Sequence, residues 1–264
     1  MLRLENVSKT FHPGTIHETR ALQGLDLHLA PGEFVTVIGG NGAGKSTLLN
    51  AVAGVWQVDG GRILIDGADV TALPEHKRAA FIGRVFQDPM MGTAPNMQIE
   101  ENLALANRRG KRRGLKWGVT RAEREEYRER LKILGLGLET RLEDKVGLLS
   151  GGQRQALTLL MASLQKPKLL LLDEHTAALD PTTAAKVLEL SDRIVEENGL
   201  TALMITHNMR DALAHGNRII MMNHGRIILD ISGEEKKHLT KQDLLDRFAA
   251  LAGEQEETDS VLLS

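Results

Sequence analysis

The stretch EFVTVIGGNGAGKST, residues 33–47, constrains the fold of this chain more than any other. A run rich in β-branched residues ends in closely spaced glycines, and a helix is predicted from Ser46 to Ala53. Glycines let a backbone wrap around a phosphate, and the following helix adds the positive end of its dipole. The stretch therefore predicts a phosphate-binding loop, although glycine-rich turns also join strands to helices without binding anything. The predicted binding residues are Gly39, Asn41, Gly42, Ala43, Gly44, Lys45, Ser46 and Thr47.

Lys45 and Ser46 complete the pattern G-x-x-x-x-G-K-S that begins at Gly39. In this pattern the lysine reaches the β- and γ-phosphates of a nucleotide, and the hydroxyl group ligates Mg²⁺. The spacing thus predicts a nucleotide and a magnesium ion at the same loop.

The apolar run KLLLLDE, residues 168–174, ends in two carboxylates. Such a run is typical of a strand that is buried on both faces. Unpaired buried charge is costly, and a nearby Mg²⁺ would explain Asp173. Glu174 would then stand where a water can attack the γ-phosphate, and a well-placed base contributes roughly 10²–10⁴-fold in rate. The alternative is a solvated strand end, which becomes less attractive beside a phosphate-binding loop.

Strand and helix signals alternate along the chain and predict an α/β sheet with a helical insertion. The insertion extends from about Ile99 to Leu164 and is most clearly helical in RAEREEYRERLKIL. A later helix over residues 180–198 has Asp180 as its N-cap and Pro181 as its first residue. The predicted strands are LRLENV, LDLHLA, EFVTVIGG, RILIDG, IGRVF, KLLLLDE and TALMIT.

Toward the end of the chain, NRIIMMNHGRIILDI predicts a hairpin that turns at His224 and Gly225. A last helix is expected from about Lys241 to Ala252. The acidic stretch GEQEETDS that follows is expected to fray.

Composition excludes several classes of protein. With 264 residues the chain can bury a sizeable core, and its net charge of −2 gives no reason to expect non-specific nucleic-acid binding. It contains no cysteine, which excludes disulfides and thiolate metal sites. The longest apolar-rich run, ALTLLMASL, is far shorter than the roughly 20 residues that span a bilayer. We therefore expect a soluble protein; if it serves a membrane, it does so through a partner.

The sequence SGGQ, Ser150–Gln153, predicts the start of a helix. Ser150 and Gln153 have the S-x-x-Q spacing of a capping box, in which each side chain satisfies a backbone N–H of the other. A helix start also favours an anion by about 0.3–1 kcal/mol. Because the chain already has one phosphate-binding loop, two glycines at a second helix start indicate a second phosphate.

Together these residues resemble those of the ATP-binding cassette family, the ATPase subunits of ABC transporters. The resemblance covers nearly the whole chain, and SGGQ matches the family signature. Further motifs match in the family's order: the aromatic residue Phe11, the Q-loop Gln87 in VFQDP, the D-loop Asp180 in AALD and the switch His207 in MITHN.

The resemblance implies a single α/β domain over residues 1–264. It would comprise a P-loop NTPase core with a mixed, largely parallel sheet, an N-terminal antiparallel β subdomain and an inserted helical subdomain. Residues 1–87 and 165–235 are expected to form the nucleotide-binding core with the β subdomain. Residues 88–164 would form the helical signature subdomain, and residues 236–264 the C-terminal helix and acidic tail.

The resemblance also gives roles to single residues. Glu174 would polarise the attacking water, His207 would contact the γ-phosphate, and Phe11 would stack on adenine. Catalytic roles are thus expected for Glu174, His207 and Gln87. Mg²⁺ and its waters would be held by Ser46, Gln87 and Asp173. ATP bound to a second subunit would be met by Ser150, Gly151, Gly152 and Gln153, with Asp180 also near nucleotide.

Simpler explanations stay open for some of these residues. Phe11 could be a core residue at a strand end, and His207 could be a satisfied core or turn histidine. Asp180 has a sufficient local role as an N-cap.

The implied function is ATP hydrolysis in a membrane ABC transporter. Two cassettes, expected to be two copies of this chain, would close over two Mg-ATP, and hydrolysis would open them. The motion would pass to transmembrane permease subunits near Gln87, with the chain held peripherally at the cytoplasmic face of a bacterial membrane.

The stretches QDPMMGTAPNMQIEENLALA and DEHTAALDPTTAAKV resemble the ATPase component of bacterial importers. That subgroup is linked to uptake of aromatic amino acids such as tryptophan or tyrosine, with an extracytoplasmic lipoprotein as substrate-binding protein. The chain departs from the commonest family pattern at His175, where many relatives have proline. It also departs at Ala156 and Met161, where many have arginine. None of the three is a phosphate ligand.

The segment RRGKRRGLKW, residues 108–117, contains six cations between Arg108 and Lys116. It could contact anionic headgroups or an acidic permease loop, at about 1 kcal/mol per cation, or it could be a solvated loop. It is also the only feature that favours a nucleic-acid-associated cassette ATPase. One cassette and no sustained heptads argue against that alternative, so no nucleic-acid partner is expected. An exporter-type cassette stays an alternative, whereas the signature and the pair Asp173–Glu174 argue against a P-loop kinase.

Overall fold

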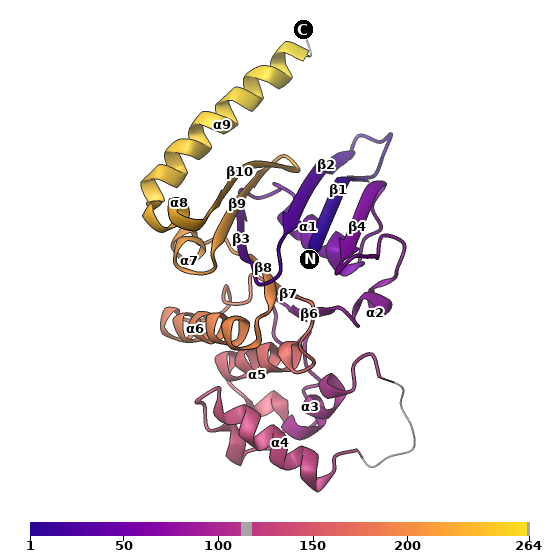
Figure 1. Cartoon of the computed structure of the whole chain (residues 1–264), viewed down its shortest axis with the longest axis vertical. Coiled ribbons are helices and arrows are strands. Elements are labelled where there is room, and N and C mark those ends of the chain that lie inside the picture. The colour runs from indigo at the N-terminus through magenta and orange to yellow at the C-terminus, as the bar shows by residue number, and fades with distance from the viewer. Residues whose placement is uncertain (112–117, 263–264) are drawn as a thin grey trace.

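The computed structural model describes residues 1–111 and 118–262, with side chains up to Leu251. Its strands form two sheets, and the N-terminal one is antiparallel with the strand order β2-β1-β4-β5 (Figure 1). Bulges after Leu4 and Val7 interrupt the period-two pattern, so β1 and β2 extend beyond the predicted strands. The bounds are β1 Leu2–Phe11, β2 Thr19–Leu29, β4 Gly60–Ile65 and β5 Ala68–Asp69.

A six-stranded sheet forms the centre, in the order β10-β9-β3-β8-β7-β6. Its pairs are parallel except for the hairpin of β9 and β10. Every residue of β8 is buried, as its continuous apolar sequence predicts for a central parallel strand. The predicted α/β fold with a mixed sheet is therefore confirmed. The bounds are β3 Phe34–Gly39, β6 Ile82–Val85, β7 Leu169–Asp173, β8 Thr201–Ile205, β9 Arg218–Asn223 and β10 Arg226–Ser232.

The register of the parallel strands determines which of the loops that follow them lie next to one another. Asp173 of β7 lies opposite Ile205 of β8, and Leu172 lies opposite Val85 of β6. The carboxyl ends of these strands and of β3 consequently lie at one edge of the sheet. Ligands of open α/β sheets bind at this edge.

The helical insertion of α3, α4 and α5 lies below the central sheet in Figure 1, beside α6. The predicted helices are confirmed, whereas α2, α7 and α8 are too short to produce a periodic signal. None of the helices within residues 1–111 and 118–262 combines the length and apolar character needed to cross a membrane. The bounds are α1 Lys45–Ala53, α2 Glu75–Arg78, α3 Ile99–Asn107, α4 Arg121–Lys132, α5 Gly151–Ser163, α6 Pro181–Asn198, α7 Met209–Ala214, α8 Gly233–His238 and α9 Lys241–Leu262.

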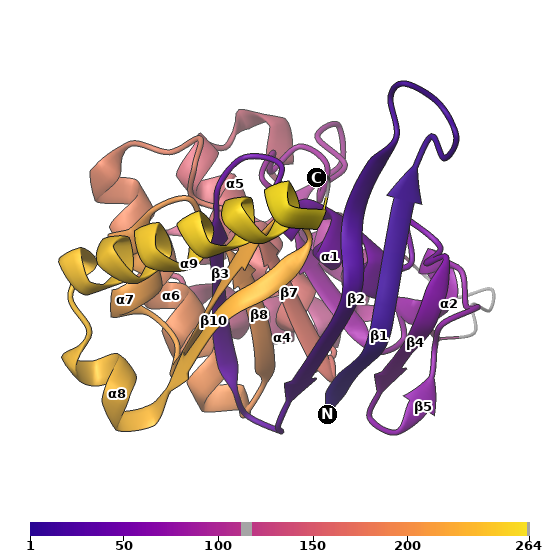
Figure 2. The same ribbon diagram turned by 90° about the horizontal axis from the view of Figure 1, so that it is seen from above.

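The expectation that GEQEETDS frays is wrong. Helix α9 continues through this stretch to Leu262. In Figure 1 it extends upward, away from the two sheets, and in Figure 2, seen from above, it passes in front of the central sheet. Glutamate and glutamine are good helix formers, and no proline interrupts the stretch. Position near the end of the chain was therefore a poorer guide than helix propensity.

The central sheet separates two large hydrophobic clusters. Consecutive residues of β7 point to opposite faces, so Leu171 packs in one cluster and Leu172 in the other. The cluster around Leu172 includes the helical insertion, and the cluster around Leu171 includes α1 and the N-terminal sheet. The sheet edge that receives the predicted site residues thus lies between two packed layers.

Candidate functional site

The predicted phosphate-binding loop joins β3 to α1. Its last residue, Gly44, is the N-cap of α1, has the left-handed φ of 97°, and supplies no side-chain cap. A Cβ at Gly44 would lie 2.4 Å from the carbonyl oxygen of Ala21, so only glycine fits. The first N–H groups of α1 are therefore not satisfied by a capping side chain, as an anion site requires.

Lys45 is almost fully buried beside this loop. Its Nζ donates to the carbonyl oxygens of Gly39 at 2.9 Å and Gly40 at 3.0 Å. Burial lowers the pKa of Lys45, and the negative charge of Glu174 opposes that shift. The lysine is thus within electrostatic reach of the predicted base.

The turn between β9 and β10 supports the loop from a distant part of the sequence. The turn lies at His224 and Gly225 as predicted. The N–H of Gly225 donates to the carbonyl of Ala43 at 3.0 Å, and its carbonyl accepts from the N–H of Gln23 at 3.1 Å. No local sequence signal indicates this contact.

Asp173, at the end of β7, has a cationic partner that the sequence did not indicate. Its Oδ2 accepts from Nη2 of Arg84 at 3.0 Å, and the same nitrogen donates to Oδ1 of Asn50 at 2.8 Å. The guanidinium of Arg84 also lies 4.6 Å from the ring centroid of Phe86. The sequence feature that could have indicated this partner is the arginine within the otherwise apolar strand β6.

The predicted base and the switch histidine are in direct contact. Nε2 of His207 lies 2.6 Å from Oε1 of Glu174, whose side chain is 12% exposed. Glu174 has a left-handed φ of 45°, and its N–H donates to the carbonyl of Ile205 at 3.1 Å. Since His207 follows β8 by two residues, adjacent parallel strands bring the pair together.

Gln87 and Phe11 lie at strand ends. Gln87 is exposed two residues past β6, at the sheet edge that also carries Glu174. Phe11 ends β1 and is half-buried rather than in the core. Its ring meets that of Trp56 edge to face at 5.5 Å between centroids, and Nζ of Lys9 lies 5.6 Å from its centroid.

The signature forms the capping box that its spacing predicts. Oγ of Ser150 accepts from the N–H of Gln153, and Oε1 of Gln153 accepts from the N–H of Ser150, both at 3.2 Å. A Cβ at Gly152 would lie 2.1 Å from Cγ2 of Thr183 on α6, whereas one at Gly151 would meet only ordinary contacts. Gly152 is therefore required by packing within this chain.

Arg154 and Gln155, which directly follow the signature, were not predicted as functional residues. Arg154 donates to the carbonyl oxygens of Gly147 at 3.1 Å and Leu149 at 3.0 Å, which fixes the segment before α5. Nε2 of the buried Gln155 donates to the carbonyl of Phe86 at 3.0 Å. The signature helix is thus tied directly to the segment that carries Gln87.

Asp180 is the N-cap of α6, as predicted. Its Oδ1 accepts from the N–H of Thr183 at 3.1 Å, and the hydrogen bonds to Thr183 lower the pKa of Asp180. The side chain is exposed, so this local role leaves its carboxylate accessible to a second subunit.

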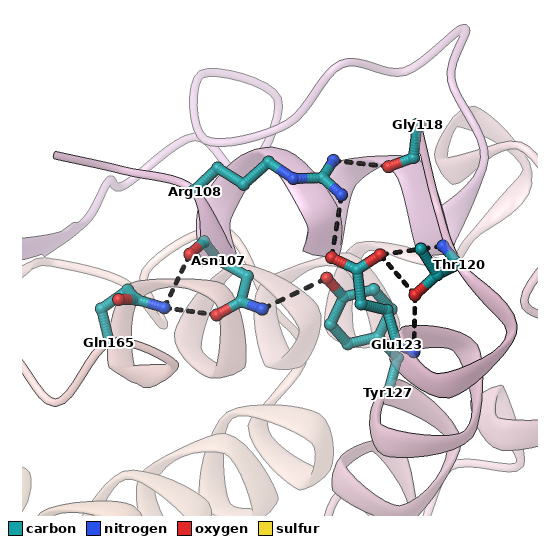
Figure 3. Close-up of polar contacts among 7 residues, drawn as sticks. All are labelled: Asn107, Arg108, Gly118, Thr120, Glu123, Tyr127 and Gln165. Atoms are coloured by element: carbon teal, nitrogen blue, oxygen red, sulfur yellow. Dashed lines mark hydrogen bonds and ion pairs between the residues drawn. The ribbon is translucent and has the colours of Figure 1, made fainter. Parts of the chain in front are cut away.

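The basic segment has its first two cations engaged within the chain. Figure 3 shows Arg108 between the carbonyl of Gly118 and the carboxylate of Glu123, which it meets at 2.8 Å. Arg109 donates to the carbonyl of Ala162 at 3.2 Å, and burial lowers its pKa. Lys111 is also among the described residues, whereas residues 112–117 lie outside them.

The residues predicted to hold Mg²⁺ suit that ion chemically. Ser46 offers a hydroxyl, Asp173 a carboxylate and Gln87 an amide oxygen, and Mg²⁺ prefers oxygen ligands. Within the described part of the chain, no group of three or more His, Asp or Glu side chains forms a ready-made metal site. Mg²⁺ is usually held by one or two carboxylates together with waters and substrate phosphates, so a sparse donor set fits it.

Comparison with known proteins decides the family. The profile described as ABC transporter matches residues 22–177, more than half of the chain. The chain belongs to this family. A tyrosine transport ATP-binding protein of Clostridioides difficile (strain R20291) is 46% identical over 253 residues, covering 94% of this chain and 98% of the relative. An aliphatic sulfonates import ATP-binding protein of Ralstonia nicotianae is 37% identical and covers 81% of this chain and 68% of the relative.

Solved ABC cassettes share the fold. A dimeric cassette in a post-hydrolysis state, bound to ADP and Pi, has a TM-score of 0.74 and 32% identity over 88% of this chain and 98% of its own. A cassette in an ADP conformation has a TM-score of 0.76 and 28% identity over 94% of this chain and 98% of its own. The resemblance seen in the sequence is confirmed, and the chain is an ATP-binding and ATP-hydrolysing subunit of the ABC transporter family.

Proposed function

We propose that this ABC ATPase drives a bacterial importer of aromatic amino acids, with tyrosine or tryptophan as cargo. The observation that carries the proposal is the 46% identity to a tyrosine transport ATP-binding protein over nearly the full length of both chains. A cassette does not touch the transported solute, so the cargo rests on kinship rather than on the site. The chain would lie at the cytoplasmic face of the membrane, with a substrate-binding protein on the other side.

The nucleotide would occupy the loop before α1. Lys45 and the first N–H groups of α1 would hold the phosphates, and Phe11 would stack on adenine. Ser46, Gln87 and Asp173 would hold Mg²⁺ and its waters, and the ion would neutralise charge on the phosphates.

Hydrolysis would use the Glu174–His207 pair. Glu174 is the proposed base because its carboxylate is largely shielded from solvent, lies near Lys45, and follows the metal-binding strand β7. His207 is more exposed, with 48% of its side chain accessible, and can turn its imidazole toward a γ-phosphate. Positioning and charge stabilisation supply most of the catalysis in phosphoryl transfer.

A second copy of the chain would complete the site. Ser150 and Gly151 are exposed at the N-terminus of α5, where free N–H groups and the helix dipole favour an anion. The proposed anion is the γ-phosphate of ATP held by the other copy, close to Asp180 of the D-loop. The existence of dimeric cassettes with the same fold supports this arrangement.

The permease would dock in a cavity of about 370 Å³ next to the Gln87 segment. The cavity lies between the central sheet and the helical insertion, so a segment seated in it would contact both. Its lining combines apolar side chains with two arginines and one glutamate, and it includes Glu75, Arg84, Phe86, Met91, Leu105 and Arg109. Met91 is 69% exposed, as expected of an apolar side chain that a partner would cover.

Replacing the proposed base tests the hydrolytic mechanism and the dimer together. Glu174→Gln should lower ATP turnover by roughly 10²–10⁴-fold and keep ATP binding. With ATP present the variant should elute as a stable dimer in size-exclusion chromatography with light scattering. Glu129→Gln, at an exposed glutamate paired with Lys132, is the matched control and should behave like the unchanged protein. Normal turnover by Glu174→Gln would contradict the base assignment, and a monomer in saturating ATP would contradict the dimer.

Purification of the ATPase with its membrane subunits tests the cargo. The accompanying binding protein should bind tyrosine or tryptophan in calorimetry and reject aliphatic sulfonates. A second candidate is release of lipid-anchored proteins, because a lipoprotein-releasing system ATP-binding protein of Ruegeria is 36% identical over 97% of its length. A complex without any solute-binding protein would favour that candidate.

A further inference from the structure

Two further histidines, His175 and His215, each follow one member of the Glu174–His207 pair along the chain. His175 directly follows Glu174 and is 2% exposed. His215 is the C-cap of α7, the helix that begins two residues after His207. Each member of the proposed catalytic pair is therefore followed along the chain by a histidine, one residue after Glu174 and eight residues after His207.

Both histidines are held by neighbouring residues of α6. Nε2 of His175 lies 2.9 Å from Oγ of Ser191, and Nδ1 of His215 lies 2.5 Å from Oδ2 of Asp192. Ser191 and Asp192 are consecutive. One short segment of α6 thus binds both segments of chain that carry the catalytic pair.

The hydrogen bonds of Ser191 determine which group donates in its contact with His175. The hydroxyl of Ser191 donates to the carbonyl of Val187 at 2.8 Å, so its single hydrogen is already used. Nε2 of His175 must therefore donate to Oγ of Ser191. The position thus requires a hydrogen-bond donor at the Nε2 site.

The backbone of Glu174 needs such support. Its left-handed φ of 45° is rare for residues other than glycine and persists only where the surroundings determine it. The N–H of Glu174 is held by Ile205, while the chain after Glu174 is fixed by the buried side chain of His175. The direction of the Glu174 carboxylate consequently depends on both contacts.

We propose that His175 and His215 are positioning residues through which α6 sets the contact between Glu174 and His207. The inference rests on the proposed roles of that pair in hydrolysis. His215 is expected to matter less than His175, because Lys236 of α8 also donates to the carbonyl oxygens of His215 and Gly216 and holds that backbone independently. Nucleotide affinity should not depend on either histidine, because the phosphate-binding loop lies on β3 and α1.

Steady-state ATPase assays of the full chain test the proposal. His175→Leu should lower kcat by about ten-fold or more, since small misplacements of a catalytic group are costly. KM for ATP should stay within about two-fold, because α1 is unchanged. His175→Gln, which can place an amide donor near the Nε2 site, should recover most of kcat. His215→Leu should show a smaller loss of kcat.

A serine variant provides a matched comparison. Ser191→Ala removes the acceptor of His175 and should lower kcat without changing KM. Ser163→Ala is the control, because Ser163 is also buried and also donates to a carbonyl of its own helix, that of Leu160 at 2.9 Å. It should leave kcat unchanged. If His175→Leu does not fold, the comparison of Ser191→Ala with Ser163→Ala decides.

Three outcomes would overturn the proposal. They are a normal kcat in folded His175→Leu, a His175→Gln variant as slow as His175→Leu, and equal effects of the two serine variants. Glu174→Gln in the same assay separates this inference from the proposed function. If it keeps normal turnover, the base assignment fails; if it is inactive while His175→Leu is normal, only the positioning role fails.

Discussion

Two helix starts in this protein present glycine-rich backbone, and they are built differently. Helix α1 begins after Gly44, which has a left-handed backbone and no side-chain cap. Helix α5 begins after Ser150, whose Oγ accepts from the N–H of Gln153 while its own N–H donates to the Gln153 side chain. The first leaves N–H groups open within the chain, whereas the second satisfies some of its own.

We propose that this difference separates a site that one chain completes from one that needs a partner. At α1 the supporting contacts come from this chain, including Lys45 and the turn at Gly225. At α5 the capping box stabilises the helix in the absence of any anion, so the free chain is stable without a ligand there. We infer that α1 contributes most of the nucleotide affinity, and that α5 adds to it only when a second copy approaches.

Loss of the lysine at α1 should produce the largest effect. Lys45→Ala removes a buried cation from the phosphate-binding loop and should lower kcat/KM for ATP by about 10²-fold or more, mainly through nucleotide affinity. Binding of a fluorescent ATP analogue to the full chain measures the change. Lys168→Ala, at an exposed lysine paired with Asp66 at 2.8 Å, is the control and should bind normally. Unchanged affinity in Lys45→Ala would show that α1 is not the primary site.

The motifs of α1 and α5 could be predicted because their chemistry demands fixed residues at fixed spacings. The loop, the capping box at Ser150 and the N-cap Asp180 were all predicted and have the expected local geometry. The pair Glu174–His207 is predictable once two parallel strands are known to be neighbours.

The long-range contacts could not be predicted from the sequence. Arg84 meets Asp173 across 89 residues, and Gly152 packs against Thr183 because two helices cross there. These contacts are set by tertiary packing. The sequence marks Arg84 as an unusual residue of an apolar strand, but it does not identify the partner of that residue. The glycines of SGGQ suggested a partner's phosphate, whereas the structure gives Gly152 a reason within its own chain. Only Gly151 still lacks an intrachain reason.

The two signature glycines should therefore respond differently to alanine. Gly152→Ala forces its Cβ onto Thr183 and should lower the free energy of unfolding by about 1–3 kcal/mol. Gly151→Ala meets only ordinary contacts and should stay within about 0.5 kcal/mol of the unchanged protein, while ATP-dependent dimerisation weakens. Chemical denaturation and light scattering measure the two quantities.

A second substitution checks the cause of the Gly152 effect. Thr183→Ser removes the Cγ2 atom that an alanine at residue 152 would strike, and it leaves the backbone N–H that caps with Asp180. The Gly152→Ala/Thr183→Ser pair should regain most of the lost stability. If it does not, a clash with Thr183 is not the cause of the lost stability, and the intrachain explanation of Gly152 is wrong.

The smallest expected effect concerns the capping box itself. Ser150→Ala should cost about 1 kcal/mol of stability, because the N–H of Gln153 loses its acceptor. Thr120→Ala is a closely matched control, since Thr120 and Glu123 form the same capping box at the start of α4 with a bond of 3.2 Å. Both variants should melt at similarly lowered temperatures. Only Ser150→Ala should also weaken the ATP-dependent dimer, because only that hydroxyl is proposed to face a second nucleotide. Equal dimerisation of the two variants would show that Ser150 acts only as a helix cap. It would contradict the proposal that its hydroxyl binds the partner's phosphate.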